Sequence, residues 1–227
     1  MGNYDVVFID ADDTLFDYAA AERFSLEQSF GEWELPYSDS VLELYAAVNK
    51  KLWAEYEQGT VTQEDLRVIR FEKIFGELGI GGDPGVFSKV YLSWLARSSF
   101  LLPGAEKICA YLSGKYTTAV ITNGIRDVQV SRIRDSAIRD YIGSLIVSEE
   151  AGCAKPNPAI FEYAAEKLRY KDKERMIMVG DSLSSDIQGG INYGIDTCWI
   201  NAKQLEVPGN IRPTYCIRSL EEITDIL

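Results

Sequence analysis

Aspartates cluster directly after the first apolar segment of the chain. The stretch "VVFIDADDTLFD" covers residues 6–17, and four of its twelve residues are aspartate. Carboxylates this close together repel one another unless a cation lies among them. Asp10 and Asp12 are therefore candidates for binding a divalent cation, and a carboxylate can also attack an electrophile or transfer a proton. The remaining ligands of such a cation must come from other parts of the chain.

Polar side chains also follow three later apolar segments, each with the composition of a buried strand. They are Thr122 and Asn123 in "VITNG", Lys155 in "AKPNP", and Asp181 and Asp186 in "VGDSLSSD". If these segments form parallel strands, their carboxyl ends meet at one edge of a sheet, where such sheets bind ligands. Carboxylates from two strands suit Mg²⁺. The Lys155 ammonium, the Thr122 hydroxyl and the Asn123 amide suit a phosphate dianion.

Each candidate residue has an ordinary structural explanation when taken alone. An Asp-x-Asp pair can be a turn or a helix cap, Lys155 can be a solvated side chain, and Asn123 with the following glycine can be a turn. Four such segments in order, each at the end of a predicted strand, favour a functional site. In that site Asp10 is free to attack phosphorus, and Asp12 can donate a proton to the leaving oxygen. Asp186 is expected to support the metal ligands or to cap a helix.

The order of the predicted elements indicates an α/β fold with a helical insertion. Residues 4–10 form a predicted strand that is buried on both faces. Apolar positions at helical spacing then predict helices over residues 40–59, 62–82 and 84–98. The remainder alternates strands with helices, which predicts right-handed βαβ units and a parallel, Rossmann-like sheet. We therefore expect an α/β core formed by residues 1–16 and 97–227, with a helical cap domain over residues 17–96.

The composition argues against several classes of function. The 227 residues carry a net charge of −12, so the basic surface of a nucleic-acid-binding protein is not expected, and binding to anionic membranes is disfavoured. No signal-peptide pattern and no apolar run of membrane-spanning length is visible. The four cysteines form no CxxC pair and are expected to be free thiols. These features predict a cytoplasmic protein that acts on a small molecule. Because the chain has no histidine, its acid–base chemistry must use other groups.

The ordered set "DADDT", "ITNG", "KP" and "GDSLSSD" resembles the haloacid dehalogenase (HAD) superfamily of Mg²⁺-dependent phosphatases, and the resemblance covers the whole chain. It implies that Asp10 is the nucleophile that forms an aspartyl-phosphate, and that Asp12 is the general acid/base. It also implies that Thr122 and Lys155 bind the phosphate. The metal would be bound by Asp10, the backbone carbonyl of Asp12, and Asp181. The helical insertion resembles a C1-type cap.

Segments that flank the motifs are similar to the pyrimidine 5′-nucleotidases of this superfamily. They are "DADDTLFDY", "LW…YEQGTVTQEDLRVIRF" and "SDIQGGINYGIDTCWIN". The similarity implies a phosphomonoesterase that acts on a nucleoside 5′-monophosphate, with selectivity provided by the cap. Arg70 is the candidate cap residue for contacting the substrate, although a solvated helix face is the commoner place for such an arginine. The aromatic residues of the cap could stack on a base, but packing in the cap core is favoured.

Other functions fit the same residues. A phosphatase of another metabolite such as a sugar phosphate, or a phosphomutase, would share the first chemical step. A haloacid dehalogenase would use the same nucleophile without a metal and without leaving-group protonation by Asp12. A non-catalytic binding module would not require the full set of residues. We expect a monomer or a small homo-oligomer that binds no nucleic acid polymer and no membrane.

Overall fold

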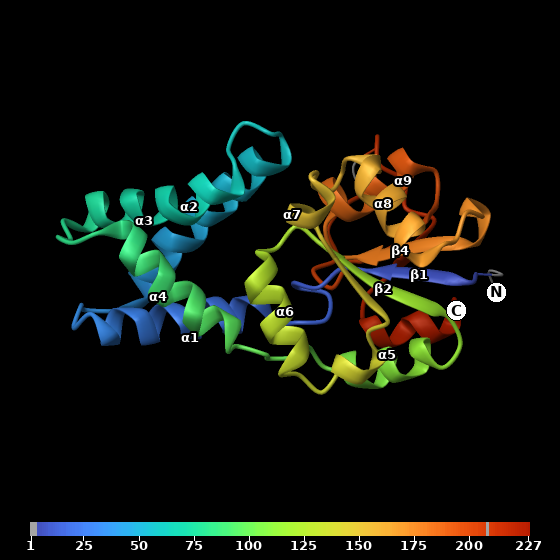
Figure 1. The fold of residues 1–227 in the computed structure, drawn as a ribbon, viewed down its shortest axis with the longest axis horizontal. Helices are drawn as coiled ribbons and strands as arrows, with labels where there is room; N and C mark the ends of the chain where they lie inside the picture. Colours follow the sequence, from blue (N-terminus) through green and yellow to red (C-terminus); the bar gives the residue numbers. More distant parts are fainter. Residues whose placement is uncertain (1–3, 208) are drawn as a thin grey trace. The chain divides into compact units, whose positions relative to one another are not determined.

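A parallel sheet forms the centre of the larger part of the protein in its computed structural model, which describes residues 4–207 and 209–227 (Figure 1). Its strands are β1 (Val6–Ile9), β2 (Thr117–Thr122), β3 (Ser144–Val147), β4 (Met176–Gly180), β5 (Asp196–Ile200) and β6 (Tyr215–Ile217). In the part of the chain that the structure describes, the strand order is β3-β2-β1-β4-β5-β6, and neighbouring strands are parallel. The α/β fold predicted from the sequence is confirmed. Because β1 lies between β2 and β4, the carboxyl ends of these three strands meet at one edge.

Apolar side chains form a separate core on each face of the sheet. In β1, Val7 and Ile9 belong to one core, and Val6 and Phe8 belong to the other. This alternation is expected of a strand that is buried on both faces. Figure 1 shows helices on both sides of the sheet. They are α5 (Ala105–Ser113), α6 (Arg126–Arg134), α7 (Ser148–Ala151), α8 (Pro158–Leu168) and α9 (Gln188–Tyr193), with short helical turns at Arg139–Tyr141, Lys173–Arg175, Leu183–Ile187 and Leu220–Asp225.

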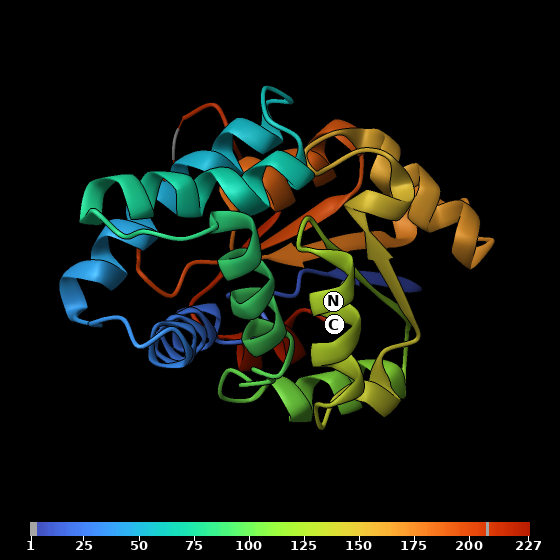
Figure 2. The ribbon, with the colours of Figure 1, turned by 60° about the vertical axis from the view of Figure 1, so that its left-hand side comes forward.

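The chain divides into two compact units. The sheet unit ends its first segment at Tyr18 and resumes at Ser99, and the second unit is Ala19–Ser98. The helices that build the second unit, which we call the cap, are α1 (Tyr18–Glu32), α2 (Asp39–Glu57), α3 (Gln63–Leu78) and α4 (Pro84–Ala96). Figure 2 shows α2 and α3 side by side, in agreement with their extensive contact. The sequence-based division placed the bounds of the cap at residues 17 and 96.

The chain leaves the sheet unit and returns to it at one place. The backbone N–H of Asp17 donates to the carbonyl of Phe100, at a nitrogen–oxygen distance of 2.9 Å, and the N–H of Leu102 donates to the carbonyl of Leu15 at 2.9 Å. Between these two hydrogen bonds, Phe16 forms an antiparallel bridge with Leu101. The two ends of the insertion are therefore joined within the sheet unit itself.

Local signals in the sequence explain where the cap helices begin and end. Thr62 precedes α3, and its hydroxyl accepts a hydrogen bond from the backbone N–H of Asp65 at 3.1 Å. Gly79 ends α3 in the left-handed region, with φ of 65°, where a residue without a side chain is favoured. Asp83 precedes α4 and accepts from the backbone N–H of Gly85 at 2.8 Å. These caps satisfy backbone donors that a helix end would otherwise leave unpaired.

Aromatic rings fill the centre of the cap. The centroid of the buried Phe71 ring lies 5.5 Å from that of Tyr45, 4.9 Å from that of Phe87 and 5.2 Å from that of Tyr91. All four rings are fully buried. The expectation that cap aromatics pack in the cap core is confirmed for Tyr45 and Tyr91.

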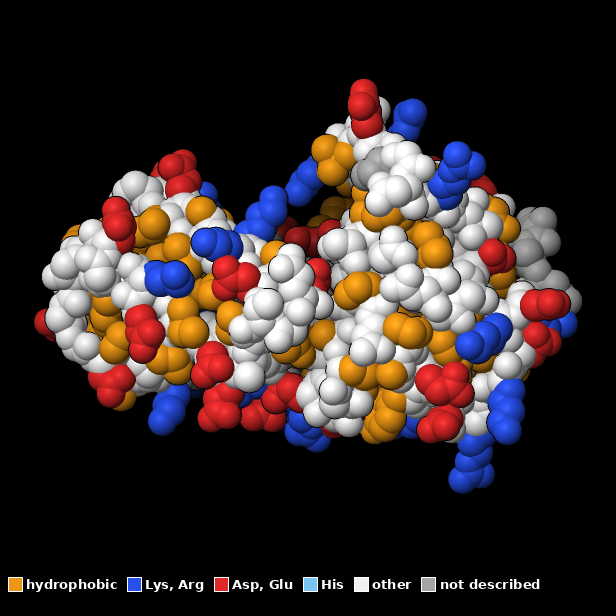
Figure 3. All heavy atoms as spheres, turned by 90° about the horizontal axis from the view of Figure 1, so that it is seen from above, with side chains coloured by type: hydrophobic (Ala, Val, Ile, Leu, Met, Phe, Trp, Pro, Cys, Tyr) orange, Lys and Arg blue, Asp and Glu red, His pale blue; other side chains and the backbone are white. Residues whose placement is uncertain are grey.

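Among residues 4–207 and 209–227, no helix has the length and apolar composition needed to cross a membrane. On the face drawn in Figure 3, both basic and acidic side chains are present.

Phe71→Ala is expected to lower the free energy of unfolding of the cap by about 3–5 kcal/mol, because it removes a fully buried ring and leaves a cavity. Urea unfolding monitored by near-ultraviolet circular dichroism measures the change. Val86→Ala on α4 is the control, since Val86 is 49% exposed. Equal unfolding free energies for the two variants would contradict this prediction.

Candidate active site

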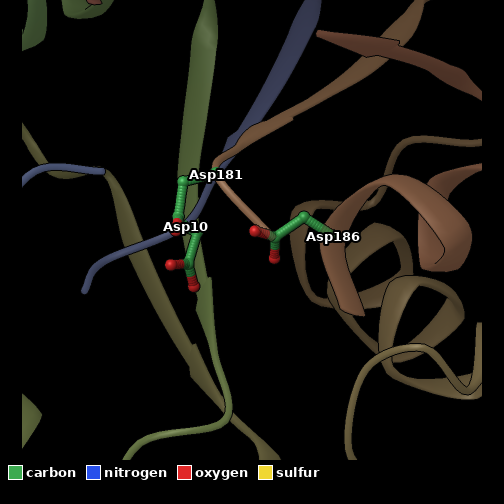
Figure 4. A group of neighbouring side chains, drawn as sticks. All are labelled: Asp10, Asp181 and Asp186. Carbon is green, nitrogen blue, oxygen red and sulfur yellow. The ribbon is translucent and has the colours of Figure 1, made fainter. Parts of the chain in front are cut away.

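Three carboxylates converge at the carboxyl edge of the sheet. Asp10 directly follows β1, Asp181 directly follows β4, and Asp186 lies in the helical turn Leu183–Ile187. Figure 4 shows the three side chains directed toward a common region. One oxygen of each carboxylate lies within 4.8 Å of the others. The pairing of β1 with β4 brings the first two together, as the order of motifs predicted.

The Lys155 ammonium lies among these carboxylates. Its Nζ donates to Asp10 Oδ1, to Asp186 Oδ1 at 2.6 Å and to the backbone carbonyl of Ile121 at 2.8 Å. The side chain is 1% exposed. Burial lowers the pKa of Lys155, but the carboxylates of Asp10 and Asp186 outweigh it and raise that pKa above its usual value. Lys155 is therefore a permanently charged group within this site.

The net negative charge of the site suits a divalent cation. Burial raises the pKa of Asp10 well above its usual value, although the Lys155 ammonium opposes this effect. Burial, followed by the charges of Asp186 and Asp13, raises the pKa of Asp181 to about 7. With all groups ionised, three carboxylates and one ammonium leave a net charge of −2. Oxygen donors carrying this charge are the set that Mg²⁺ prefers.

Asp186 is enclosed by the loop that carries it. Its side chain is fully buried, and Oδ2 accepts a hydrogen bond from the backbone N–H of Ser182 at 3.0 Å. Gly180 lies directly against it, since a Cβ at that position would come within 2.2 Å of Asp186 Oδ2. Asp186 therefore holds Lys155 and the backbone of the loop after β4. Its expected support of the metal ligands stays a prediction.

Asn123 makes a contact that was not predicted from the sequence. Its Nδ2 donates to the backbone carbonyl of Lys155 at 2.9 Å, and its Oδ1 accepts from the backbone N–H of Lys155 at 2.8 Å. Both ends of the side-chain amide are thus bonded to one residue. The amide therefore fixes the loop that presents Lys155, and its predicted contact with phosphate stays a prediction.

Thr122 ends β2 beside this loop. Its side chain is buried, and Oγ1 accepts a hydrogen bond from the backbone N–H of Gly124 at 3.0 Å. The hydroxyl keeps a proton to donate, as the predicted phosphate contact requires. That contact stays a prediction.

Asp12 is held apart from the group of three carboxylates. Gln129 Nε2 donates to its Oδ2 at 2.6 Å, and Arg132 Nη1 forms an ion pair with its Oδ1. The Asp12 side chain remains 26% exposed. The predicted metal contact of the Asp12 backbone carbonyl stays a prediction.

Four side chains of the site were missed by the sequence reasoning. Gln129 and Arg132 bind Asp12, Thr14 Oγ1 donates to Asp181 Oδ1 at 3.3 Å, and Trp199 Nε1 donates to the Asp181 carbonyl at 2.8 Å. The first two carried a usable signal. They lie three residues apart on the helix that follows "ITNG", so they share a helix face near the site.

Arg70 lies inside the cap. It is 1% exposed, and its Nη1 donates to the Tyr45 hydroxyl at 2.9 Å and to Asn49 Oδ1 at 3.4 Å. The guanidinium carbon also lies 4.9 Å from the centroid of the Tyr91 ring. The alternative of a solvated helix face is wrong, because neighbouring cap residues cover the side chain. The role of Arg70 in substrate selectivity stays a prediction.

Known proteins share this arrangement of sequence and fold. Over 225 residues the chain is 38% identical to a pyrimidine 5′-nucleotidase, YjjG, of Escherichia coli strain K12, covering 99% of this chain and 98% of that one. It is 32% identical to another, PynA of Streptococcus pneumoniae strain ATCC BAA-255/R6, covering 99% and 95%. A crystal structure of YfnB from Bacillus subtilis bound to magnesium superposes with a TM-score of 0.93 at 32% identity, covering 99% of both chains.

The family model for haloacid dehalogenase-like hydrolases matches residues 4–194, which include every site residue predicted from the sequence. The resemblance inferred from the four motifs is thereby confirmed, and this chain belongs to the haloacid dehalogenase-like hydrolases.

Proposed function

We propose that the protein is a Mg²⁺-dependent phosphomonoesterase that acts through an aspartyl-phosphate on a pyrimidine nucleoside 5′-monophosphate. The observation that carries the proposal is the buried Lys155 ammonium, which binds Asp10 and Asp186 beside the Asp181 carboxylate. A permanent positive charge next to a carboxylate nucleophile is what the attack on a phosphate dianion requires.

Each residue of the site has its own role in the proposed reaction. Asp10 attacks the phosphorus, and the bond from phosphorus to the ester oxygen breaks. Asp12 gives its proton to that oxygen, and later takes a proton from the water that hydrolyses the aspartyl-phosphate. Lys155 and Thr122 hold the phosphoryl oxygens. Asp10, the Asp12 carbonyl and Asp181 would hold Mg²⁺, which when bound offsets the repulsion between the carboxylates and the phosphate.

The residues around Asp12 favour a phosphatase over a haloacid dehalogenase. A halide leaves without a proton, so such an enzyme has no use for a carboxylate at the position of Asp12. Here that carboxylate is partly exposed and bound by two side chains of α6. A phosphomutase shares the first step and differs only in the group that accepts the phosphoryl.

The substrate class rests on the relatives and on the cap. Two relatives at 32–38% identity over nearly the whole chain are pyrimidine 5′-nucleotidases. The sheet-edge residues bind only the phosphoryl group and the metal, so discrimination between esters must come from groups that face the leaving group. We assign this to the cap, with Arg70 as the predicted determinant. The alternative is a phosphatase that acts on sugar phosphates, and a screen of metabolites distinguishes the two.

Asp10→Asn should abolish turnover of p-nitrophenyl phosphate and of uridine 5′-monophosphate, by a factor of about 10³ or more, because an amide is a poor nucleophile. Steady-state phosphate release measures the loss, and far-ultraviolet circular dichroism verifies that the fold is intact. Asp140→Asn is the control, since the Asp140 side chain is 76% exposed and pairs with Arg139 away from the site. Near wild-type turnover in Asp10→Asn would exclude the covalent mechanism.

Asp181→Ala should raise the Mg²⁺ concentration needed for half-maximal activity by about ten-fold or more, because one of the oxygen ligands is lost. Titration of EDTA-treated protein with Mg²⁺ measures this concentration. Asp140→Ala is the control, since its side chain is 76% exposed and pairs with Arg139. An unchanged Mg²⁺ requirement in Asp181→Ala would remove Asp181 from the metal ligands.

Pyrimidine nucleoside 5′-monophosphates should be hydrolysed with a higher kcat/KM than purine nucleotides or sugar phosphates. Arg70→Met should lower kcat/KM for the nucleotide more than for p-nitrophenyl phosphate, by about 1–3 kcal/mol if its hydrogen bond to the substrate is charge-assisted. Lys73→Met, at an exposed position of the same helix, is the control. A screen led by sugar phosphates would end the nucleotidase assignment. Equal losses of kcat/KM on both substrates would show that Arg70 contributes only to the packing of the cap.

A further inference from the structure

Two side chains of α6 hold the Asp12 carboxylate, and no step of the proposed reaction uses them. Gln129 donates to one carboxylate oxygen and Arg132 to the other. An aspartate that is partly exposed would otherwise rotate between several rotamers. With a donor at each oxygen, the plane of the carboxylate is fixed, and each oxygen retains a lone pair for other partners.

Arg132 is itself fixed by the turn that carries Asp12. Its side chain is fully buried, and its guanidinium carbon lies 4.4 Å from the centroid of the Phe16 ring. Phe16 closes this turn, because its backbone N–H donates to the carbonyl of Ala11 at 2.9 Å. The guanidinium is therefore stacked on one residue of the turn and paired with another. Burying an arginine is costly unless its charge is compensated, and Asp12 supplies the charge.

The burial of Gln129 gives a second indication that these side chains are present to bind Asp12. The side chain is 1% exposed, and its Oε1 accepts no hydrogen bond from any residue that the structure describes. A buried carbonyl without a partner destabilises a protein, and a leucine of similar size would avoid that cost. The visible gain from the amide is the hydrogen bond of 2.6 Å to Asp12.

Gly124 provides the space for this contact. A Cβ at that position would lie 2.3 Å from Gln129 Nε2 and 3.0 Å from its Cδ. The colliding atoms belong to the end of a flexible side chain. An alanine at position 124 would therefore push the amide aside without forcing the backbone to move.

We propose that Gln129 and Arg132 are positioning residues that orient Asp12 for proton transfer to the leaving oxygen, and that position 124 is glycine because any side chain would displace Gln129. The proposal rests on the proposed function, since it assumes that Asp12 protonates the leaving group. It adds a link between the "ITNG" segment and the acid: Gly124 acts on Asp12 through Gln129.

The test compares a nucleotide with an ester whose leaving group needs little protonation. Gln129→Leu and Arg132→Met should slow the pre-steady-state phosphorylation of the enzyme by uridine 5′-monophosphate about ten-fold, a fraction of the full effect of a general acid. With p-nitrophenyl phosphate both variants should stay within about two-fold of the wild type. Arg134→Met is the matched control on the same helix, because Arg134 is 66% exposed and pairs with Asp135. A role limited to folding would change both substrates equally.

Gly124→Ala supplies a second measurement that does not remove a polar group. It should reproduce the selective loss of Gln129→Leu, whereas the double variant Gly124→Ala/Gln129→Leu should be no slower than Gln129→Leu alone. Additive losses in the double variant would overturn the proposed link. Gln129→Leu also keeps the proposal testable if Arg132→Met fails to fold.

Asp12→Asn separates this proposal from the proposed function. If Asp12→Asn shows no selective loss with the nucleotide, the general-acid role of Asp12 fails and the proposal fails with it. If Asp12→Asn shows the loss and the Gln129 and Arg132 variants do not, only the positioning proposal is overturned. A faster nucleotide reaction in either α6 variant would also overturn it, since the two residues would then be holding Asp12 away from the reaction.

Discussion

The site depends on the contacts of the buried Lys155 ammonium. It contacts carboxylates from two different segments, Asp10 after β1 and Asp186 after β4, and also a carbonyl of β2. Without this charge, three carboxylates within 4.8 Å of one another, two of them buried, would repel strongly. The charge in turn requires that the backbone of Lys155 be held, and Asn123 does this with two hydrogen bonds. The ends of three adjacent strands are thus linked through one side chain.

The parts of the site that could be predicted are those fixed by chain topology. Parallel strands bring their carboxyl ends to one edge, so polar residues that follow apolar segments must meet there. This reasoning found Asp10, Lys155, Asp181 and Asp186, and it gave the α/β fold with a helical insertion. It needed only the order of segments and the period of the apolar residues.

The parts that could not be predicted depend on where individual side chains point. The two hydrogen bonds from the Asn123 amide to the backbone of Lys155 were not predicted. Arg70 was expected most readily on a solvated face, because a charged residue is usually exposed; the aromatic packing of the cap buries it instead. The contact between Gln129 and Asp12 joins residues 117 positions apart. Such long-range side-chain contacts cannot be predicted from the local periodicity of a single sequence.

The junction between the two units has a consequence for how enzymes of this design can diversify. Two backbone hydrogen bonds and the bridge between Phe16 and Leu101 close the sheet unit on itself where the cap begins and ends. The inserted segment therefore begins and ends at adjacent positions of the sheet unit. Its length, sequence and helix number can change without altering the register of the sheet or the spacing of the carboxylates. Natural selection can exchange the cap while the carboxylates at the edge of the sheet are inherited unchanged, and a grafted cap offers the same freedom in the laboratory.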